Sequence, residues 1–196
     1  MMKLHAFLAG CVLAVAAALP VAAHPITFVG TLSDLGEANP SPGTGFVTVI
    51  FDDDAFTMNV HASFSGLIGT TTAAHIHCCT AVAGTGNAGV ATPVPYFPGF
   101  PLDVHAGTYD RLFDMTQPSS WNPAFITANG GSILSAFAAF STGLNAGKAY
   151  FNIHSTFGPG GEIRTFLAPV PEPETYALLA LGLGVLALAG RRRSDR

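Results

Sequence analysis

A strict alternation of apolar and polar side chains is the pattern that most constrains the fold of this chain. From Phe56 to Phe64 every second residue is apolar, and the residues between them are polar. Successive side chains of a β-strand point to opposite faces, so this period of two predicts a strand with one buried face. Residues 45–51 are also apolar and β-branched, and residues 52–54 are three aspartates. We expect a hairpin whose aspartates form a solvated turn rather than a calcium site.

Other segments extend this all-β prediction. Strands are expected at residues 26–32, 73–77, 109–115, 149–155 and 162–167. The 22 glycines and 14 prolines suit turns, and only 10% of residues are charged, against about 25% in an ordinary globular domain. A helical turn is expected near residues 121–128, and one amphipathic helix at 132–144, capped by Ser132. We therefore expect an antiparallel β-sandwich or barrel-like domain with one short helix.

The N-terminal segment is typical of a secretory signal peptide. Lys3 precedes 14 uncharged residues, 6–19, and small side chains stand before position 24. This pattern predicts cleavage after Ala23 and passage through the Sec translocon with signal peptidase as a partner. Residues 8–11 resemble a lipobox ending at Cys11, but the apolar run continues well past this cysteine, which favours ordinary cleavage.

The C-terminal segment has three consecutive parts. Val-Pro-Glu-Pro at residues 170–173 precedes an apolar run, 176–190, and an arginine cluster, 191–193. A helix over that run would be roughly 22 Å long, short for a ~30 Å hydrocarbon core. With the arginines in the cytoplasm, the preceding domain would lie outside the membrane. A transmembrane helix is expected at about 175–190.

This tripartite pattern closely resembles the PEP-CTERM sorting signal of Gram-negative bacteria. The resemblance covers residues 170–196 and includes Pro171, Glu172, Pro173, Arg191, Arg192 and Arg193. It implies recognition by an exosortase that cuts near the Pro-Glu-Pro box. It also implies a transient inner-membrane anchor with the domain on the periplasmic side. The destination would then be the cell surface or an extracellular polysaccharide or biofilm matrix.

The charge balance of the exported body argues against nucleic acid as a partner. Residues 24–170 carry three lysines and arginines against nine aspartates and glutamates. A basic patch is the electrostatic footprint of nucleic-acid binding, and this composition cannot build one.

The densest group of ligand-type side chains is His75, His77, Cys78 and Cys79. On a strand the two histidines point to one face, and Ile76 points to the other. His154 lies on a comparable face of the strand expected at 149–155. If the two strands are neighbours, three imidazoles can converge. Imidazole and thiolate bind copper or zinc, so a metal site is one hypothesis. Glu162 would then be near enough to orient one ring.

Two other interpretations remain open at this point. The histidines and Asn152 could form a hydrogen-bonded structural network that ties two strands together. Alternatively, Cys78 and Cys79 could be a redox-active pair, since signal-peptide removal leaves them as the remaining cysteines in an oxidising environment. Adjacent cysteines can close a small ring, bond to another chain or bind a metal.

Three motifs together resemble the CHRD domain, the module named after chordin. They are Ala-His-Ile-His at 74–77, Ala-Tyr-Phe-Asn-Ile-His at 149–154 and Pro-Gly-Gly-Glu-Ile-Arg at 159–164. The resemblance covers residues 26–168 and implies an all-β fold, with Asn152, Glu162 and Arg164 as family-motif residues. The family often has Gly-Pro where this chain has Cys78 and Cys79.

The expected organisation is a signal peptide (1–23), a CHRD domain (24–168) and a sorting signal (169–196). No catalytic set is apparent, because a Gly-X-Ser-X-Gly motif and an acid/base dyad are both missing from the sequence. The first functional hypothesis is a non-enzymatic exported protein of the cell surface or matrix. The second is a metal-binding or redox protein centred on the His/Cys group.

Overall fold

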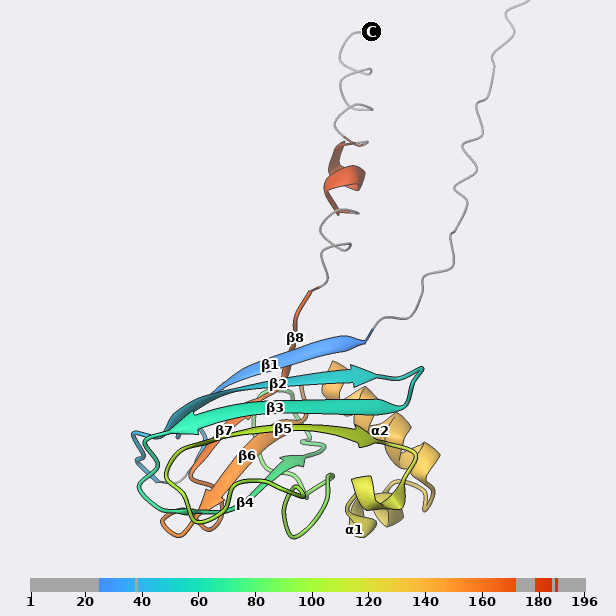
Figure 1. Ribbon diagram of the computed structural model, residues 1–196. Coiled ribbons are helices and arrows are strands. Elements are labelled where there is room, and N and C mark those ends of the chain that lie inside the picture. Colours follow the sequence, from blue (N-terminus) through green and yellow to red (C-terminus); the bar gives the residue numbers. More distant parts are fainter. Residues whose placement is uncertain (1–24, 38, 172–178, 185, 187–196) are drawn as a thin grey trace, which may run out of the picture.

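The computed structural model describes residues 25–37, 39–171, 179–184 and 186. Within them, two antiparallel sheets pack face to face, and two short helices stand at one end of the sheets (Figure 1). This arrangement confirms the prediction of an all-β sandwich. The expected signal peptide and arginine cluster lie outside the described residues.

The larger sheet has the strand order β5-β3-β2-β1-β8. Its strands are β1 (Ile26–Leu32), β2 (Thr44–Asp52), β3 (Thr57–Ser65), β5 (Gly107–Asp114) and β8 (Ala168–Pro169). The alternating segment is β3, and its apolar side chains are buried as predicted. β2 and β3 form the expected hairpin, with Asp52 paired to Thr57 at its closed end.

The smaller sheet has the order β4-β6-β7, from β4 (Thr71–His77), β6 (Tyr150–Ser155) and β7 (Ile163–Phe166). Its inner face contributes fully buried side chains to the core, namely Ala74, Ile76, Phe151, Ile153 and Ile163. Reciprocal backbone hydrogen bonds between Ser33 and Arg164 join the two sheets at one corner. The outer face of this sheet is therefore the face on which the predicted histidines lie.

The helices are α1 (Pro123–Ala128) and α2 (Ile133–Asn145), preceded by a 3-10 turn, Pro118–Ser120. Ser132 caps α2 in a capping box with Ser135, as its sequence position predicts. Phe137 and Phe140 of α2 pack on Phe51 of β2, with ring centroids 4.9 and 5.8 Å apart. α2 thus closes the end of the sandwich with aromatic side chains.

In the described part of the chain, no helix combines the length and the apolar character needed to cross a bilayer. Most of the span expected at about 175–190 falls on residues that the structure does not describe.

Candidate metal centre

Three histidine side chains meet on the outer face of the β4-β6-β7 sheet. His75 and His77 come from β4, and His154 comes from the neighbouring strand β6. Because Ala73 is the residue opposite His154, the His154 ring lies diagonally beside the His75 ring, with centroids 5.1 Å apart. One candidate ligand nitrogen from each ring lies within 4.8 Å of the other two. The predicted adjacency of the two strands is therefore present.

Each of the three rings donates one hydrogen bond to a backbone carbonyl. His75 Nε2 donates to Pro95 at 2.6 Å, His77 Nδ1 to Ala88 at 2.9 Å, and His154 Nδ1 to Pro159 at 2.9 Å. A carbonyl oxygen only accepts, so these nitrogens carry the protons of the neutral rings. The tautomer of each histidine is consequently set by the backbone of a loop.

The opposite nitrogen of each ring has no such partner. His75 Nδ1, His77 Nε2 and His154 Nε2 are buried and without a hydrogen bond to the residues that the structure describes. Each of these nitrogens bears the lone pair of the neutral ring. Three buried lone pairs therefore belong to one cluster of rings, and their nitrogens are the ones free to bind a metal ion.

The surroundings keep the rings neutral. Burial lowers the pKa of His75 to about 4, although its hydrogen bond to Pro95 opposes the shift, and the neighbouring histidines lower the pKa further. Burial likewise lowers the pKa of His77 to about 4, opposed by the hydrogen bond to Ala88 and assisted by the charges of His154 and Arg164. Burial lowers the pKa of His154 as well. At neutral pH all three lone pairs are available.

An aromatic and cationic stack supports the His77 ring. Tyr150 lies parallel to His77, with centroids 4.7 Å apart and planes inclined by 8°. The Arg164 guanidinium lies over the Tyr150 ring, 5.0 Å from its centroid. Arg164 is itself held by Asn87, at 2.7 Å, and by Glu37, at 3.5 Å. The family-motif arginine thus positions a candidate ligand through Tyr150.

The structure contradicts one sequence-based expectation, that Glu162 orients one of the histidine rings. The Glu162 carboxylate is fully buried and accepts four hydrogen bonds, from Ser41 Oγ, Ile68 N, Gly69 N and Ser155 Oγ. Burial raises the pKa of Glu162, but these hydrogen bonds outweigh it and leave the pKa below its usual value. Glu162 is therefore an ionised structural hub that ties the loop at residues 68–69 to β6.

The expected hydrogen-bonded network of histidines and Asn152 is also absent among the described residues. Asn152 Nδ2 donates to the carbonyl of Gly160 at 3.3 Å, and each histidine bonds to a loop carbonyl instead. The strands are held together by their backbone ladder, not by these side chains.

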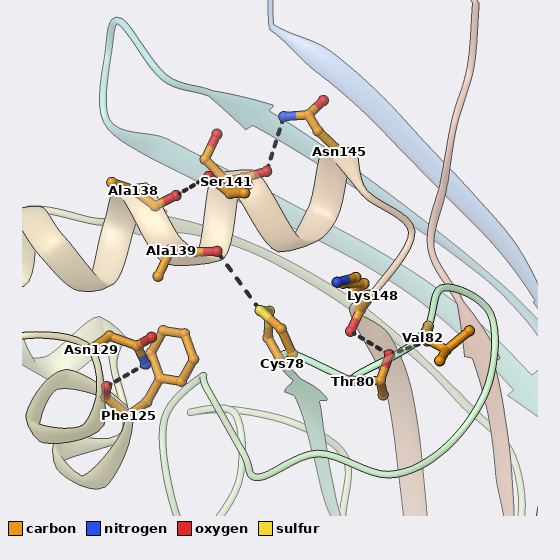
Figure 2. The surroundings of a disulfide bond; sticks show 12 residues. Cys78, Thr80, Val82, Phe125, Asn129, Ala138, Ala139, Ser141, Asn145 and Lys148 are labelled. Atoms are coloured by element: carbon orange, nitrogen blue, oxygen red, sulfur yellow. Dashed lines mark hydrogen bonds between the residues drawn. A yellow bond between two sulfur atoms is a disulfide. The ribbon is translucent and has the colours of Figure 1, made fainter.

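Cys78 and Cys79 do not join the histidines. They are bonded to each other in a disulfide that packs against α2 (Figure 2). The group of candidate ligands in the described chain consists of the three histidines without either cysteine.

The groups that hold the three histidine rings in place were not predicted from the sequence. Three of them are backbone carbonyls, of Ala88, Pro95 and Pro159, and a carbonyl leaves no trace in residue type. The signal that existed was the density of proline in residues 93–101, which predicts an irregular loop with free carbonyls. For Tyr150, the only signal in the sequence was its place on the same face of the predicted strand as His154.

The fold and this centre define a β-sandwich domain with a cluster of three imidazoles on its smaller sheet. Comparison with sequence families places the chain in one of them: residues 28–167 match the CHRD domain, so the protein belongs to the CHRD family. Residues 169–193 match the PEP-CTERM protein-sorting motif. The chain is accordingly an exported, surface-directed protein that an exosortase processes. No curated protein and no solved structure gave a significant match.

Proposed function

We propose that this CHRD-domain protein binds a transition metal ion, copper or zinc, through His75 Nδ1, His77 Nε2 and His154 Nε2. The observation that carries the proposal is the pairing of three carbonyl-bound ring nitrogens with three buried, unpartnered ones. Leaving a buried polar atom unpaired costs about 1–3 kcal/mol. Three such atoms facing one another favour a ligand set over a purely structural cluster.

The donor chemistry fits this assignment. Metal-binding histidines commonly donate their second N–H to a carbonyl or carboxylate, which fixes the ring and its tautomer. Neutral imidazole suits both zinc and copper, and three protein ligands leave a fourth position open for water or another ligand. Zn–N bonds of about 2.0–2.1 Å in a tetrahedron put nitrogens about 3.4 Å apart. The present spread, up to 4.8 Å, requires the rings to move inward on binding.

A second candidate function is that of a matrix component without metal. The PEP-CTERM match supports export and exosortase processing, and an extracellular polysaccharide or biofilm matrix is the destination that we propose. Under both candidates the organisation would be a signal peptide at 1–23, a CHRD domain at 24–168 and a sorting signal at 169–196. A Gram-negative host with Sec export, signal peptidase cleavage and a cell-surface or biofilm destination completes the proposal.

Metal analysis of the protein, purified without a histidine tag, tests the proposed function. We expect about one equivalent of copper or zinc per chain after reconstitution and desalting. The His75→Ala, His154→Ala double variant should lose it. His61→Ala is the matched control, because His61 lies on β3 beside Asp110, outside the cluster. Less than a tenth of an equivalent in the unaltered protein would leave the metal-free matrix component as the function.

Processing is tested separately. The Pro171→Ala, Glu172→Ala variant should remain full length in membranes if an exosortase cuts at this box. Unchanged processing of that variant would show that the cut lies elsewhere.

A further inference from the structure

The disulfide between Cys78 and Cys79 lies directly after the histidine strand, but on the side that faces the helices. Cys78 is buried at 4% exposure, whereas Cys79 is exposed. Cys79 Sγ lies 3.7 Å from the carbonyl oxygen of Ala139 in α2 (Figure 2). The bond therefore joins one buried cysteine to one with exposed surface.

A structural role accounts poorly for this bond. A disulfide stabilises a fold chiefly by restricting the unfolded chain, and this effect grows with the length of the loop that it closes. Here the sequence separation is one residue, so no loop is closed. The bond does not connect two elements of the fold. Its removal would therefore add little conformational entropy to the unfolded chain. Chemical reactivity is the remaining property that such a bond offers.

α2 is shaped to accommodate both sulfurs. A Cβ atom added at Gly143 would overlap the Sγ atoms of both Cys78 and Cys79. Glycine in a helix interior costs about 1 kcal/mol relative to alanine. The helix thus gives up intrinsic stability at the position where a side chain would displace the disulfide.

Two hollows open on either side of Cys79. One, of about 460 Å³, is lined by Cys79, Thr142, Gly143 and Lys148, among others. The other, of about 390 Å³, lies between Cys79 and α1, with Phe125 and Asn129 in its lining. Both hollows give a small molecule access to the surface of Cys79.

We propose that the Cys78–Cys79 disulfide is a thiol–disulfide exchange site that accepts two electrons from a dithiol. One thiolate of the dithiol attacks Cys79 Sγ, the Cys78–Cys79 bond breaks, and Cys78 Sγ leaves and takes up a proton. The second thiol of the dithiol then attacks its own sulfur in the mixed disulfide. Cys79 departs as a thiolate and takes up the second proton, and the dithiol is released as a disulfide. Two protons and two electrons pass to the protein, so the exchange balances.

Alkylation of the folded protein tests this proposal. The full protein, in metal-free buffer with a chelator, is treated with dithiothreitol, trapped with iodoacetamide and weighed by mass spectrometry. We expect both Cys78 and Cys79 to be alkylated, with the circular dichroism spectrum unchanged. Reduction that requires denaturant would overturn the proposal.

Single-cysteine variants test the direction of attack. In Cys78→Ser the remaining Cys79 should react with iodoacetamide at least about tenfold faster than Cys78 does in Cys79→Ser, because reaction follows thiolate character and exposure. Equal rates would contradict entry at Cys79.

Discussion

Glu162 and the three-histidine cluster both bury polar groups around the β6-β7 hairpin, yet their hydrogen bonding differs. Both carboxylate oxygens of Glu162 are saturated, with two donors each. Each histidine is satisfied on one nitrogen and left open on the other. A group that the fold needs for itself has all its partners within the fold. A histidine whose ring is held by one hydrogen bond, and whose other nitrogen keeps a free lone pair, can bind a ligand from outside the fold.

The largest expected effect is at Glu162. Glu162→Ala removes the acceptor of two backbone N–H groups and two serine hydroxyls. We expect the free energy of unfolding, measured by urea denaturation, to fall by about 3–5 kcal/mol. Glu162→Gln, which keeps the shape and removes the charge, should lose less. A loss below about 1 kcal/mol in the alanine variant would show that the fold does not depend on Glu162.

Metal should give the next largest effect. A ligand that binds the folded chain at a hundred times its dissociation constant stabilises it by about 2.7 kcal/mol. We expect the thermal midpoint to rise with zinc or copper and to return with a chelator. His154→Ala should abolish the rise, and His61→Ala should preserve it. A rise that survives in His154→Ala would assign the effect to another site.

Acid should weaken the metal-free protein before it affects the carboxylates. The pKa of His75 and of His77 falls from 6.5 in the unfolded chain to about 4 in the folded chain, so the unfolded chain binds more protons between these values. Their stabilising contribution is present above pH 6.5 and is lost as the pH falls toward 4. Chelator-treated protein, unfolded by urea at several pH values, should show this slope. The His75→Ala, His77→Ala variant should show a shallower slope over the same window.

The smallest effect is expected for His77→Phe in the metal-free protein. The substitution removes one unpartnered nitrogen, keeps the stack on Tyr150 and loses one hydrogen bond to Ala88. These changes oppose one another, so stability should change by less than about 1 kcal/mol. Metal binding should nevertheless be lost. A loss of stability as large as that of Glu162→Ala would show that the cluster is structural.

The strands were predictable because their side chains follow local patterns. The alternation in β3, the His-Ile-His order in β4 and the Ser132 cap of α2 depend on neighbours a few residues away. The partners of Glu162 were not predictable, because Ile68 and Gly69 precede it by more than 90 residues and offer only backbone N–H groups. The partner of Arg164 is likewise the distant Glu37. Long-range polar contacts thus lie beyond what residue spacing can indicate.

The strand β8 was also missed, since two residues contain no pattern. It nevertheless has a consequence for the order of folding. β8 pairs with Phe28 and Val29, and the N–H of Val170 donates to the carbonyl of Thr27 at 2.7 Å. In a chain exported from its N-terminus, β1 emerges first and its outer edge stays bare until residues 168–170 have followed. An unpaired strand edge invites aggregation. In a chain exported in this way, β8 would cover the edge of β1 only after the whole domain has been exported. A cut within residues 171–173 would remove the C-terminal tail and leave β8 paired with β1.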